Sequence, residues 1–319
     1  MRALITNDYG DSPKIARVPR PDFSPDEVLV EVVSSSVNGF DAMAAGGHLK
    51  GMLPHTFPAV LGKDFAGTIE AVGADVRGFA PGDEVFGAVT DLSVGRGTIA
   101  EYAVVRPTVG LTHRPAGLDR AQAGALTIAG STAYAAVEAL ALQPGETVLI
   151  VGATGGVGSL AVQLAKATGA RILATHRDTR GASYLTGLGA HEPIDATDDL
   201  AAAVRKHAPD GVHAALHLAG DLDTVTGLVK DGGRLATPAA QPAPDAYADR
   251  GLSVIPVMAD AGATVLDHLA TEVVAGRLHV PIARTFTLDH APMALRAFDT
   301  SKNGKIAIYH RKGAEIILF

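Results

Sequence analysis

The sequence predicts an α/β protein in which a β-rich first part precedes a doubly wound parallel sheet. Two textures along the 319 residues lead to this prediction. Up to about residue 120, short β-branched runs alternate with Gly and Pro turns, as at Val28–Val33 and Ala80–Asp83, which is typical of a barrel or sandwich. From about 121 to 259, Ala-rich helical stretches alternate with short apolar runs, the pattern of parallel strands covered on both faces.

The individual elements follow from these runs. Besides Val28–Val33, the first part has a strand-like run at Thr68–Val72. Four buried strands are expected in the second part: Thr147–Val151, Arg171–Thr175, Val212–Leu218 and Arg234–Thr237. The last part is expected to hold a helix over Ala263–Ala275, a strand at Ile282–Phe286, a helix over about Ala291–Thr300 and a strand at Lys305–Tyr309.

Composition excludes several classes of function. The 27 Lys and Arg against 34 Asp and Glu give a formal net charge of −7, which argues against a general nucleic-acid binder. With no Cys, the chain has no disulfide, thiol nucleophile, iron–sulfur cluster or Cys-ligated zinc. A cytoplasmic location is expected. No membrane span is expected, because the most apolar stretch, Ala121–Leu142, carries Glu138.

The most informative segment follows the expected strand Thr147–Val151. It consists of Ala153, Thr154, Gly155, Gly156, Val157 and Gly158. Gly155 and Gly158 supply the second and third glycines of G-x-G-x-x-G, with Ala153 in place of the first, between a strand and a helix. This context predicts a loop that binds the pyrophosphate of a dinucleotide at a helix N-terminus. The alternative is a tight turn that holds no ligand.

The end of the next expected strand predicts which dinucleotide is bound. NAD-specific domains place a carboxylate there for the ribose 2′-hydroxyl, whereas this chain has Thr175, His176 and Arg177 with Arg180 close behind. A 2′-phosphate would not be repelled, and Arg177 or Arg180 would pair with it, so NADPH is predicted. The nearby carboxylate of Asp178 weakens the prediction of NADPH. The alternative is that Arg177 and Arg180 are simply solvated and bind no phosphate.

Seven ordered segments together resemble one known family. They are Ser36–Asp41, Phe57–Gly67, Pro81–Gly87, Gly97–Tyr102, Gly130–Tyr134, the Ala153–Gly158 loop and Gly304–Ile306. Over its full length the chain resembles the medium-chain dehydrogenase/reductase superfamily, and within it the zinc-free quinone oxidoreductase group. The resemblance implies a GroES-like β-barrel catalytic domain formed by residues 1–125 and 260–319, with an inserted Rossmann NADP-binding domain over 126–259.

Departures from the family pattern bear on the chemistry. Zinc-dependent relatives carry Cys, His and Cys as catalytic ligands, and the matching positions here are Asn38, Lys63 and Ile128. These residues cannot rebuild that site, so no zinc is expected and no Lewis acid polarises a carbonyl. Zinc-free relatives reduce quinones or the C=C bond of α,β-unsaturated carbonyls, by hydride transfer to the β-carbon and then protonation from water or a nearby side chain.

The resemblance also implies roles for four residues. Asn38 and Thr132 would hydrogen-bond near the nicotinamide or its ribose, Asp41 would shape the substrate site, and Lys63 stands at a former ligand position. Each has a structural alternative: an Asx turn for Asn38 and Asp41, a helix N-cap for Thr132, and a surface position for Lys63.

A pair of histidines in the second part raises the question of a metal site. His213 and His217 are four residues apart, but they fall on an expected strand, where that separation spans about 13 Å. They are therefore not expected to share an ion.

The predicted function is an NADPH-dependent, zinc-independent reductase of a small quinone or conjugated carbonyl. An enoyl-thioester reductase of a polyketide or lipid pathway is a second hypothesis, and a non-catalytic NADPH-binding sensor or interaction protein is a third. By analogy with the family, a homodimer is expected.

Overall fold

The computed structural model describes residues 1–241, 243, 245–298, 300 and 303–310, which form two compact units. The first unit contains Met1–Ile128 with the described residues of 261–301 and 305–310, and the second contains Ala129–Asp260 with the described residues of 302–304. The roles predicted for 1–125, 126–259 and 260–319 stay predictions, and residues 311–319 of the last segment lie outside the described residues.

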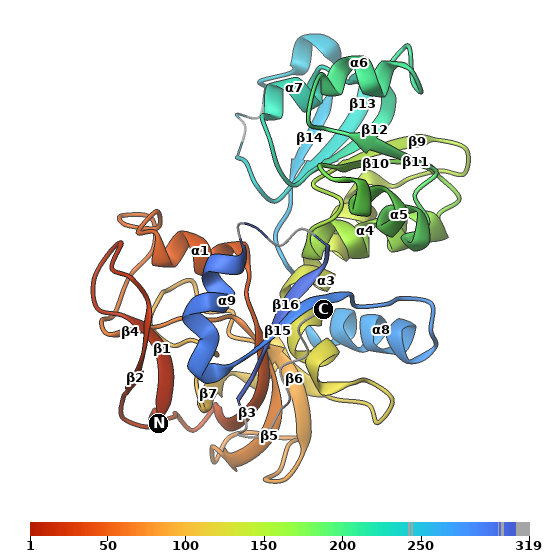
Figure 1. The fold of residues 1–319 in the computed structure, drawn as a ribbon. Coiled ribbons are helices and arrows are strands. Elements are labelled where there is room, and N and C mark those ends of the chain that lie inside the picture. Colours follow the sequence, from red (N-terminus) through yellow and green to blue (C-terminus); the bar gives the residue numbers. More distant parts are fainter. Residues whose placement is uncertain (242, 244, 299, 301–302, 311–319) are drawn as a thin grey trace. The chain divides into compact units, whose positions relative to one another are not determined.

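The first unit is built mainly from two sheets (Figure 1). The larger has the strand order β15-β16-β3-β5-β6-β8, with β7 also paired to β3. Its strands are β3 (Val28–Ser36), β5 (Asp64–Val72), β6 (Glu84–Ala88), β7 (Tyr102–Val105), β8 (Leu111–His113), β15 (Ile282–Thr287) and β16 (Lys305–Tyr309). The smaller sheet contains β1 (Arg2–Thr6), β2 (Lys14–Arg17) and β4 (Ala59–Val60) in the order β2-β1-β4.

The pairing of β16 with β3 joins segments from opposite ends of the sequence. The two strands are antiparallel, with Ala307 opposite Ser36 and Tyr309 opposite Ser34. This register places Lys305, the first residue of β16, beside the segment that follows β3. The helices of this unit are α1 (Gly39–Ala45), α2 (Pro107–Gly110), α8 (Ala263–Val274), η2 (Leu288–His290) and α9 (Ala291–Phe298).

The second unit contains a parallel sheet with the order β11-β10-β9-β12-β13-β14. Its strands are β9 (Thr147–Val151), β10 (Arg171–His176), β11 (Glu192–Asp195), β12 (Val212–His217), β13 (Val229–Thr237) and β14 (Ser253–Pro256). Numbered along the chain, this order is 3-2-1-4-5-6, that of a doubly wound dinucleotide-binding sheet. The predicted fold class is therefore confirmed.

Helices connect these strands. They are α4 (Gly156–Ala167), α5 (Thr179–Leu188), α6 (Leu200–Arg205), α7 (Leu222–Thr226) and the short η1 (Ala248–Arg250). Before them, α3 (Arg120–Leu140) contains the boundary between the two units. The apolar stretch Ala121–Leu142 falls largely in α3, where Ala123 and Leu126 are fully buried. Among the described residues, no helix is both long and apolar enough to cross a membrane.

Two strands begin earlier than predicted, because glycines made the predicted runs start too late. β5 begins at Asp64 rather than Thr68, although Gly67 lies inside it. A Cβ at Gly67 would stand 2.3 Å from the Glu31 carbonyl oxygen, so glycine there allows close approach to β3. Likewise, β13 begins at Val229 and runs through Gly233, where a Cβ would meet Val229 at 2.5 Å.

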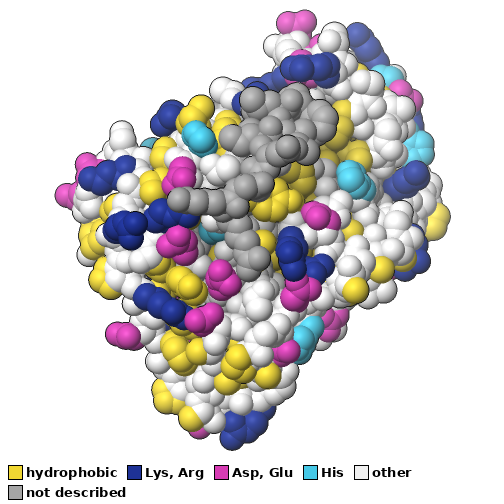
Figure 2. Space-filling model, turned by 60° about the horizontal axis from the view of Figure 1, so that its bottom comes forward, with side chains coloured by type: hydrophobic (Ala, Val, Ile, Leu, Met, Phe, Trp, Pro, Cys, Tyr) yellow, Lys and Arg dark blue, Asp and Glu magenta, His cyan; other side chains and the backbone are white. Residues whose placement is uncertain are grey.

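Surface charges of both signs are interspersed on the face shown in Figure 2. Exposed pairs such as Arg20 with Glu70, and Arg106 with Asp26, each have a shortest N–O distance of 2.9 Å. Opposite charges therefore neutralise one another locally.

His310, which directly follows β16, makes stability depend on pH. Its Nδ1 lies 2.8 Å from the Ala100 carbonyl oxygen, so that nitrogen donates, and Nε2 accepts from Ser35 Oγ at 2.8 Å. Burial lowers the pKa of His310 from 6.5 to about 4. The unfolded chain thus takes up the proton first as pH falls, and the folded state loses up to roughly 3 kcal/mol between pH 6.5 and 4.

We expect His310→Gln to remove this pH dependence, because a glutamine amide keeps a donor and an acceptor without titrating. The measurement is the urea midpoint at pH 7.5 and at pH 5 for both proteins. Contributions from other titrating groups cancel in the comparison. Equal losses of stability on acidification would contradict the assignment to His310.

Candidate functional site

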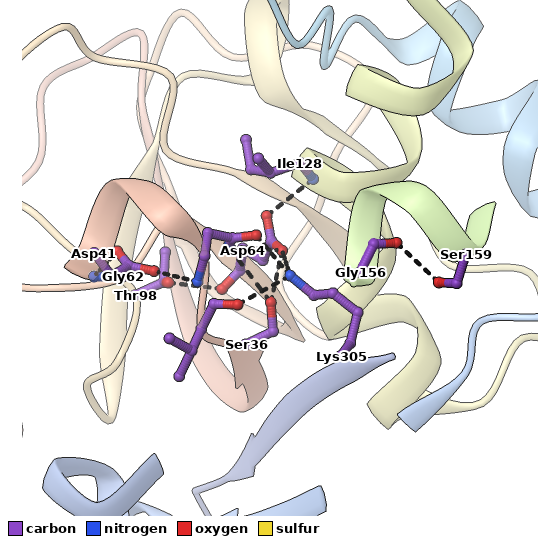
Figure 3. Close-up of polar contacts among 11 residues, drawn as sticks. Ser36, Asp41, Gly62, Asp64, Thr98, Ile128, Gly156, Ser159 and Lys305 are labelled. Carbon is purple, nitrogen blue, oxygen red and sulfur yellow. Dashed lines mark hydrogen bonds and ion pairs between the residues drawn. The ribbon is translucent and has the colours of Figure 1, made fainter. Parts of the chain in front are cut away.

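Five polar side chains are buried together in the first unit (Figure 3). We call Ser36, Asn38, Asp41, Asp64 and Lys305 the polar cluster. Ser36 ends β3, Asn38 is the N-cap of α1, Asp64 begins β5 and Lys305 begins β16. The exposed fraction is 6% for Asn38, 4% for Lys305, 1% for Asp41 and zero for the others. Such groups are stable in a core only when they bind one another.

Lys305 is the cation of the polar cluster. Its Nζ donates to Asn38 Oδ1 at 2.6 Å and to the Val37 carbonyl oxygen at 3.1 Å, and it lies 3.5 Å from Asp64 Oδ2. Burial lowers the pKa of Lys305, against the attraction of Asp64 and Asp41. In the sequence, Lys305 stands out only as part of the family motif Gly304–Ile306, which assigns it no role.

Asp64 joins two of the three positions that correspond to zinc ligands in relatives. Its Oδ2 accepts from Ser36 Oγ at 2.7 Å and Asn38 Nδ2 at 3.0 Å, and its Oδ1 accepts from the Ile128 N–H at 3.0 Å. Asn38 and Ile128 are thereby brought together around a carboxylate. Sequence reasoning missed Asp64, and the one available signal is an acidic residue directly before the apolar run Phe65–Ala66.

Asp41 binds backbone on both carboxylate oxygens. Oδ2 accepts from the Asn38 N–H at 2.8 Å and Oδ1 from the Gly62 N–H at 3.0 Å. Burial raises the pKa of Asp41 to about 6. Asp41 thus fixes the start of α1 against the segment before β5.

Lys63 is buried, and the surface alternative is wrong. Only 8% of the residue is exposed, and Nζ donates to the Asp91 carbonyl oxygen at 2.8 Å and lies 4.3 Å from the centre of the Phe40 ring. Burial lowers its pKa. Lys63 lines a small pocket of the first unit with Phe40 and Asp41, and its hydrogen bonds go to backbone carbonyls rather than to Asp64.

The predicted phosphate loop lies between β9 and α4 of the second unit. Gly152, which the prediction did not include, makes the turn with a φ of +83°, and Gly155 is the N-cap of α4. The N–H groups of the first helical turn, Gly156–Gly158, have no intrahelical partner. Gly155 is paired with Gly304 in an isolated parallel bridge, in which the Gly304 N–H donates to the Thr154 carbonyl oxygen at 2.8 Å. The amides of this first turn lie at the positive end of the helix dipole, which attracts anions.

The loop glycines have different structural requirements. A Cβ at Gly158 would lie 2.4 Å from the Gly152 carbonyl oxygen and 2.5 Å from Ala153 Cα, so the packing of α4 on β9 requires glycine there. A Cβ at Gly155 would meet only the Gly152 oxygen, at an ordinary 3.4 Å. Contact at the Cβ position therefore does not require glycine at 155. Ala153 and Thr154 are buried.

The end of β10 holds the residues predicted to read the ribose. Thr175 is buried, and its Oγ1 accepts from the Gly152 N–H at 2.9 Å, so it fixes the loop. His176 is 9% exposed, and its Nδ1 has no hydrogen-bond partner among the described residues. Arg177 and Arg180 are exposed.

Asp178, the carboxylate that argued against NADPH, is the N-cap of α5. Its Oδ1 accepts from the Gly181 N–H at 2.6 Å. The carboxylate is therefore used in capping a helix.

Thr132 lies inside α3, which begins at Arg120, so the N-cap alternative is wrong. The helix continues through Gly130 and Ser131 to Thr132 and beyond. Thr132 is 6% exposed and belongs to the second unit, whereas the polar cluster belongs to the first.

His213 and His217 lie on β12, as expected. His213 Nδ1 accepts from the Thr147 N–H at 3.1 Å, and His217 is within 3.1 Å of Thr237 Oγ1 and the Gly220 carbonyl oxygen. Each ring thus has a separate structural use. Within the described part of the chain, no three His, Asp or Glu side chains are grouped as metal ligands.

Two family models match the chain. The alcohol dehydrogenase GroES-like domain matches residues 24–115, and the zinc-binding dehydrogenase model matches residues 156–265. The matched segments correspond to the β-rich first part and the parallel sheet.

Named relatives and a solved structure agree with these matches. Over 231 residues the chain is 34% identical to the chloroplastic quinone-oxidoreductase of Triphysaria versicolor, covering 70% of this chain and 69% of that protein. It is 31% identical to the chloroplastic NADPH-dependent alkenal/one oxidoreductase of Arabidopsis thaliana, covering 74% of this chain and 61% of that protein. The quinone oxidoreductase structure from Coxiella burnetii is 26% identical, with a TM-score of 0.87 over 98% of this chain and 99% of that one.

The motifs, the sheet order and these likenesses point the same way. The chain belongs to the medium-chain dehydrogenase/reductase superfamily, in its zinc-free quinone oxidoreductase group, and is an oxidoreductase.

Proposed function

We propose that this protein uses NADPH to reduce a quinone or the C=C bond of an α,β-unsaturated carbonyl, without zinc. The observation that carries the proposal is the polar cluster. In it Asp64 binds Asn38 and the Ile128 backbone, which stand at positions that correspond to zinc ligands in the zinc-dependent relatives. Hydrogen-bonded in this way, these groups present no ligand set for a metal. A conjugated acceptor suits such a site, since its own π-system spreads the developing charge.

The phosphate loop fits a dinucleotide. Gly155 has no side chain and is the N-cap of α4, where the helix dipole favours an anion. When bound, NADPH supplies hydride to the β-carbon of the acceptor. The role of Gly152 and Thr175 is to hold the loop in the conformation that receives the phosphates, and the role of Gly155 is to leave room for them.

The choice of NADPH over NADH rests on the end of β10. Asp178 is engaged by the Gly181 amide, and Arg177 and Arg180 are exposed nearby in sequence. A guanidinium pairs with a phosphate through two parallel hydrogen bonds, which favours the 2′-phosphate of NADPH.

In the reduction, the electron pair of the hydride enters at the β-carbon and displaces the π electrons toward the carbonyl oxygen, which becomes an enolate oxygen. A proton from water then adds at the α-carbon, and the C=O bond re-forms. The chain's contribution is a donor for that oxygen, for which Asn38 Nδ2 is the proposed group, and exclusion of bulk water. Lys63 is a second cationic group of the same unit.

A homodimer and a cytoplasmic location complete the proposal. The edge strand β14 of the parallel sheet offers a surface for pairing between two copies.

The function is tested by NADPH oxidation with ortho-quinones, para-quinones, linear enones, an enoyl thioester and a saturated ketone, with NADH in parallel. We expect turnover of the quinones or enones and none of the ketone, because no Lewis acid polarises an isolated carbonyl. Preference for the thioester would favour the enoyl-thioester reductase instead. Cofactor binding without turnover of any acceptor would favour the non-catalytic hypothesis.

Two glycine variants separate ligand binding from folding. Gly155→Val is expected to keep its melting temperature but to lose NADPH affinity by about tenfold or more, because its side chain fills the space for the pyrophosphate. Gly158→Ala is expected to lose roughly 1–3 kcal/mol of stability, because its Cβ collides with backbone. Fluorescence titration and thermal melting distinguish the two. Unchanged affinity in Gly155→Val would remove the loop from the cofactor site.

Arg177→Ala is expected to weaken NADPH about tenfold and NADH hardly at all, since only NADPH carries the 2′-phosphate. Arg205→Ala, which replaces an exposed arginine in the last turn of α6, is the control. The measurement is the dissociation constant for each cofactor. Equal losses for both cofactors would show that Arg177 does not contact the 2′-phosphate.

A further inference from the structure

Lys305 has a buried charge whose nearest partner is a neutral group. Its Nζ is 2.6 Å from the amide oxygen of Asn38 but 3.5 Å from the carboxylate of Asp64. Removing an ammonium from water is costly, and a carboxylate at close range would compensate it best. The ammonium instead lies closest to the Asn38 amide, so its main effect is on that amide.

The partners on either side determine how the Asn38 amide is oriented. A lysine ammonium only donates and an ionised carboxylate only accepts. Oδ1 must therefore face Lys305, and Nδ2 must face Asp64 Oδ2, to which it donates at 3.0 Å. The amide oxygen and nitrogen of Asn38 are thus distinguished by the chemistry of their partners, because distances alone do not tell the two atoms apart.

One N–H of Asn38 remains available for a ligand. Nδ2 carries two hydrogens, and beyond Asp64 its other partner is Ser36 Oγ at 3.5 Å, the limit of hydrogen-bond distance. Ser36 itself donates to Asp64 at 2.7 Å. Asn38 is also the member of the polar cluster with the largest accessible fraction, 6%.

The ammonium strengthens that donor. An ammonium hydrogen-bonded to the amide oxygen draws electron density away from the amide nitrogen. The N–H groups of that nitrogen become better donors, as in any chain of polarised hydrogen bonds. The opposing charge of Asp64 is already shared among Ser36, Asn38 and the Ile128 amide. Donors that are fixed in advance stabilise an oxygen most when that oxygen gains negative charge.

We propose that Lys305 is a positioning residue for the reduction: it orients and polarises the Asn38 amide, so that Nδ2 donates to the substrate oxygen on which negative charge develops. This inference rests on the proposed function. It names the chemical class that the first unit recognises as an oxygen anion of the enolate or phenolate type. Lys305 acts through Asn38 and need not touch the substrate.

The test removes the charge without leaving a buried ion unpaired. Lys305→Met alone would strand the Asp64 carboxylate and unfold part of the core, so the informative protein is the double variant Asp64→Asn/Lys305→Met. The amide introduced by Asp64→Asn keeps an acceptor for the Ile128 N–H. Its NH2 group then faces Ser36 Oγ and Asn38 Nδ2, which donate to Asp64 Oδ2 in the wild type, so the Asn38 amide must turn over to accept from it, and its orientation is lost together with the charge. The methionine fills the volume of the lysine stem. The matched control is Glu101→Gln/Arg2→Met, which neutralises another ion pair of the same unit, 2.9 Å apart.

Two readouts are needed, one of them independent of turnover. The first is kcat and KM with a linear enone, alongside thermal melting and NADPH affinity. The second is the affinity of the full-length protein, saturated with NADP⁺, for 4-nitrophenolate, an enolate-like oxygen anion, compared with its neutral methyl ether, 4-nitroanisole.

For the double variant we expect an intact fold and NADPH affinity within about twofold, but kcat lowered roughly tenfold and weaker phenolate binding by a similar factor. Binding of 4-nitroanisole is expected to stay unchanged, and so are all properties of the control.

A folded double variant with wild-type kcat and wild-type phenolate affinity would overturn the inference and leave Lys305 a purely structural residue. Equal losses for the phenolate and its ether would also overturn it, because they would indicate a change of shape rather than of charge. If the wild-type protein reduces no acceptor, the proposed function fails, and the phenolate arm still decides whether Lys305 acts through Asn38.

Discussion

The antiparallel pairing of β16 with β3 is the constraint on which the polar cluster depends. It brings Lys305 to Asn38 across 267 positions of sequence and supplies the cation that the buried Asp64 requires. A slip of one residue in this register would turn Lys305 to the other face of the sheet and leave Asp64 uncompensated. The hydrogen bond from Lys305 to the Asn38 amide oxygen follows from this alignment.

The two units use different physics to prepare their sites. In the second unit the determining factor is steric: Gly158 allows α4 to pack on β9, and Gly155 leaves space that packing does not use. In the first unit the determining factor is electrostatic, because Asp64 and Lys305 are stable in the core only through each other and through Asn38. The glycine loop therefore tolerates changes of charge nearby, whereas the polar cluster depends on each of its charged and polar side chains.

These different origins explain what could be predicted from the sequence. The parallel sheet and the glycine turn between β9 and α4 were predictable, because a strand, a turn and a helix are contiguous in the sequence. The partners of Asp64 come from β3, α1, α3 and β16, so no local pattern revealed the polar cluster. The N-cap alternative for Thr132 failed because α3 begins twelve residues earlier, at Arg120. Lys63 is buried because backbone carbonyls satisfy its ammonium, which composition does not reveal.

The insertion of the second unit between two parts of the first has a consequence for biosynthesis. A ribosome releases Asp64 long before Lys305, and the whole parallel sheet emerges in between. The second unit can fold as soon as it emerges, whereas the core of the first must wait with a carboxylate that has no cation. Closure of the first unit is therefore a late step, and a nascent chain that stalls before residue 305 is a substrate for chaperones and proteases.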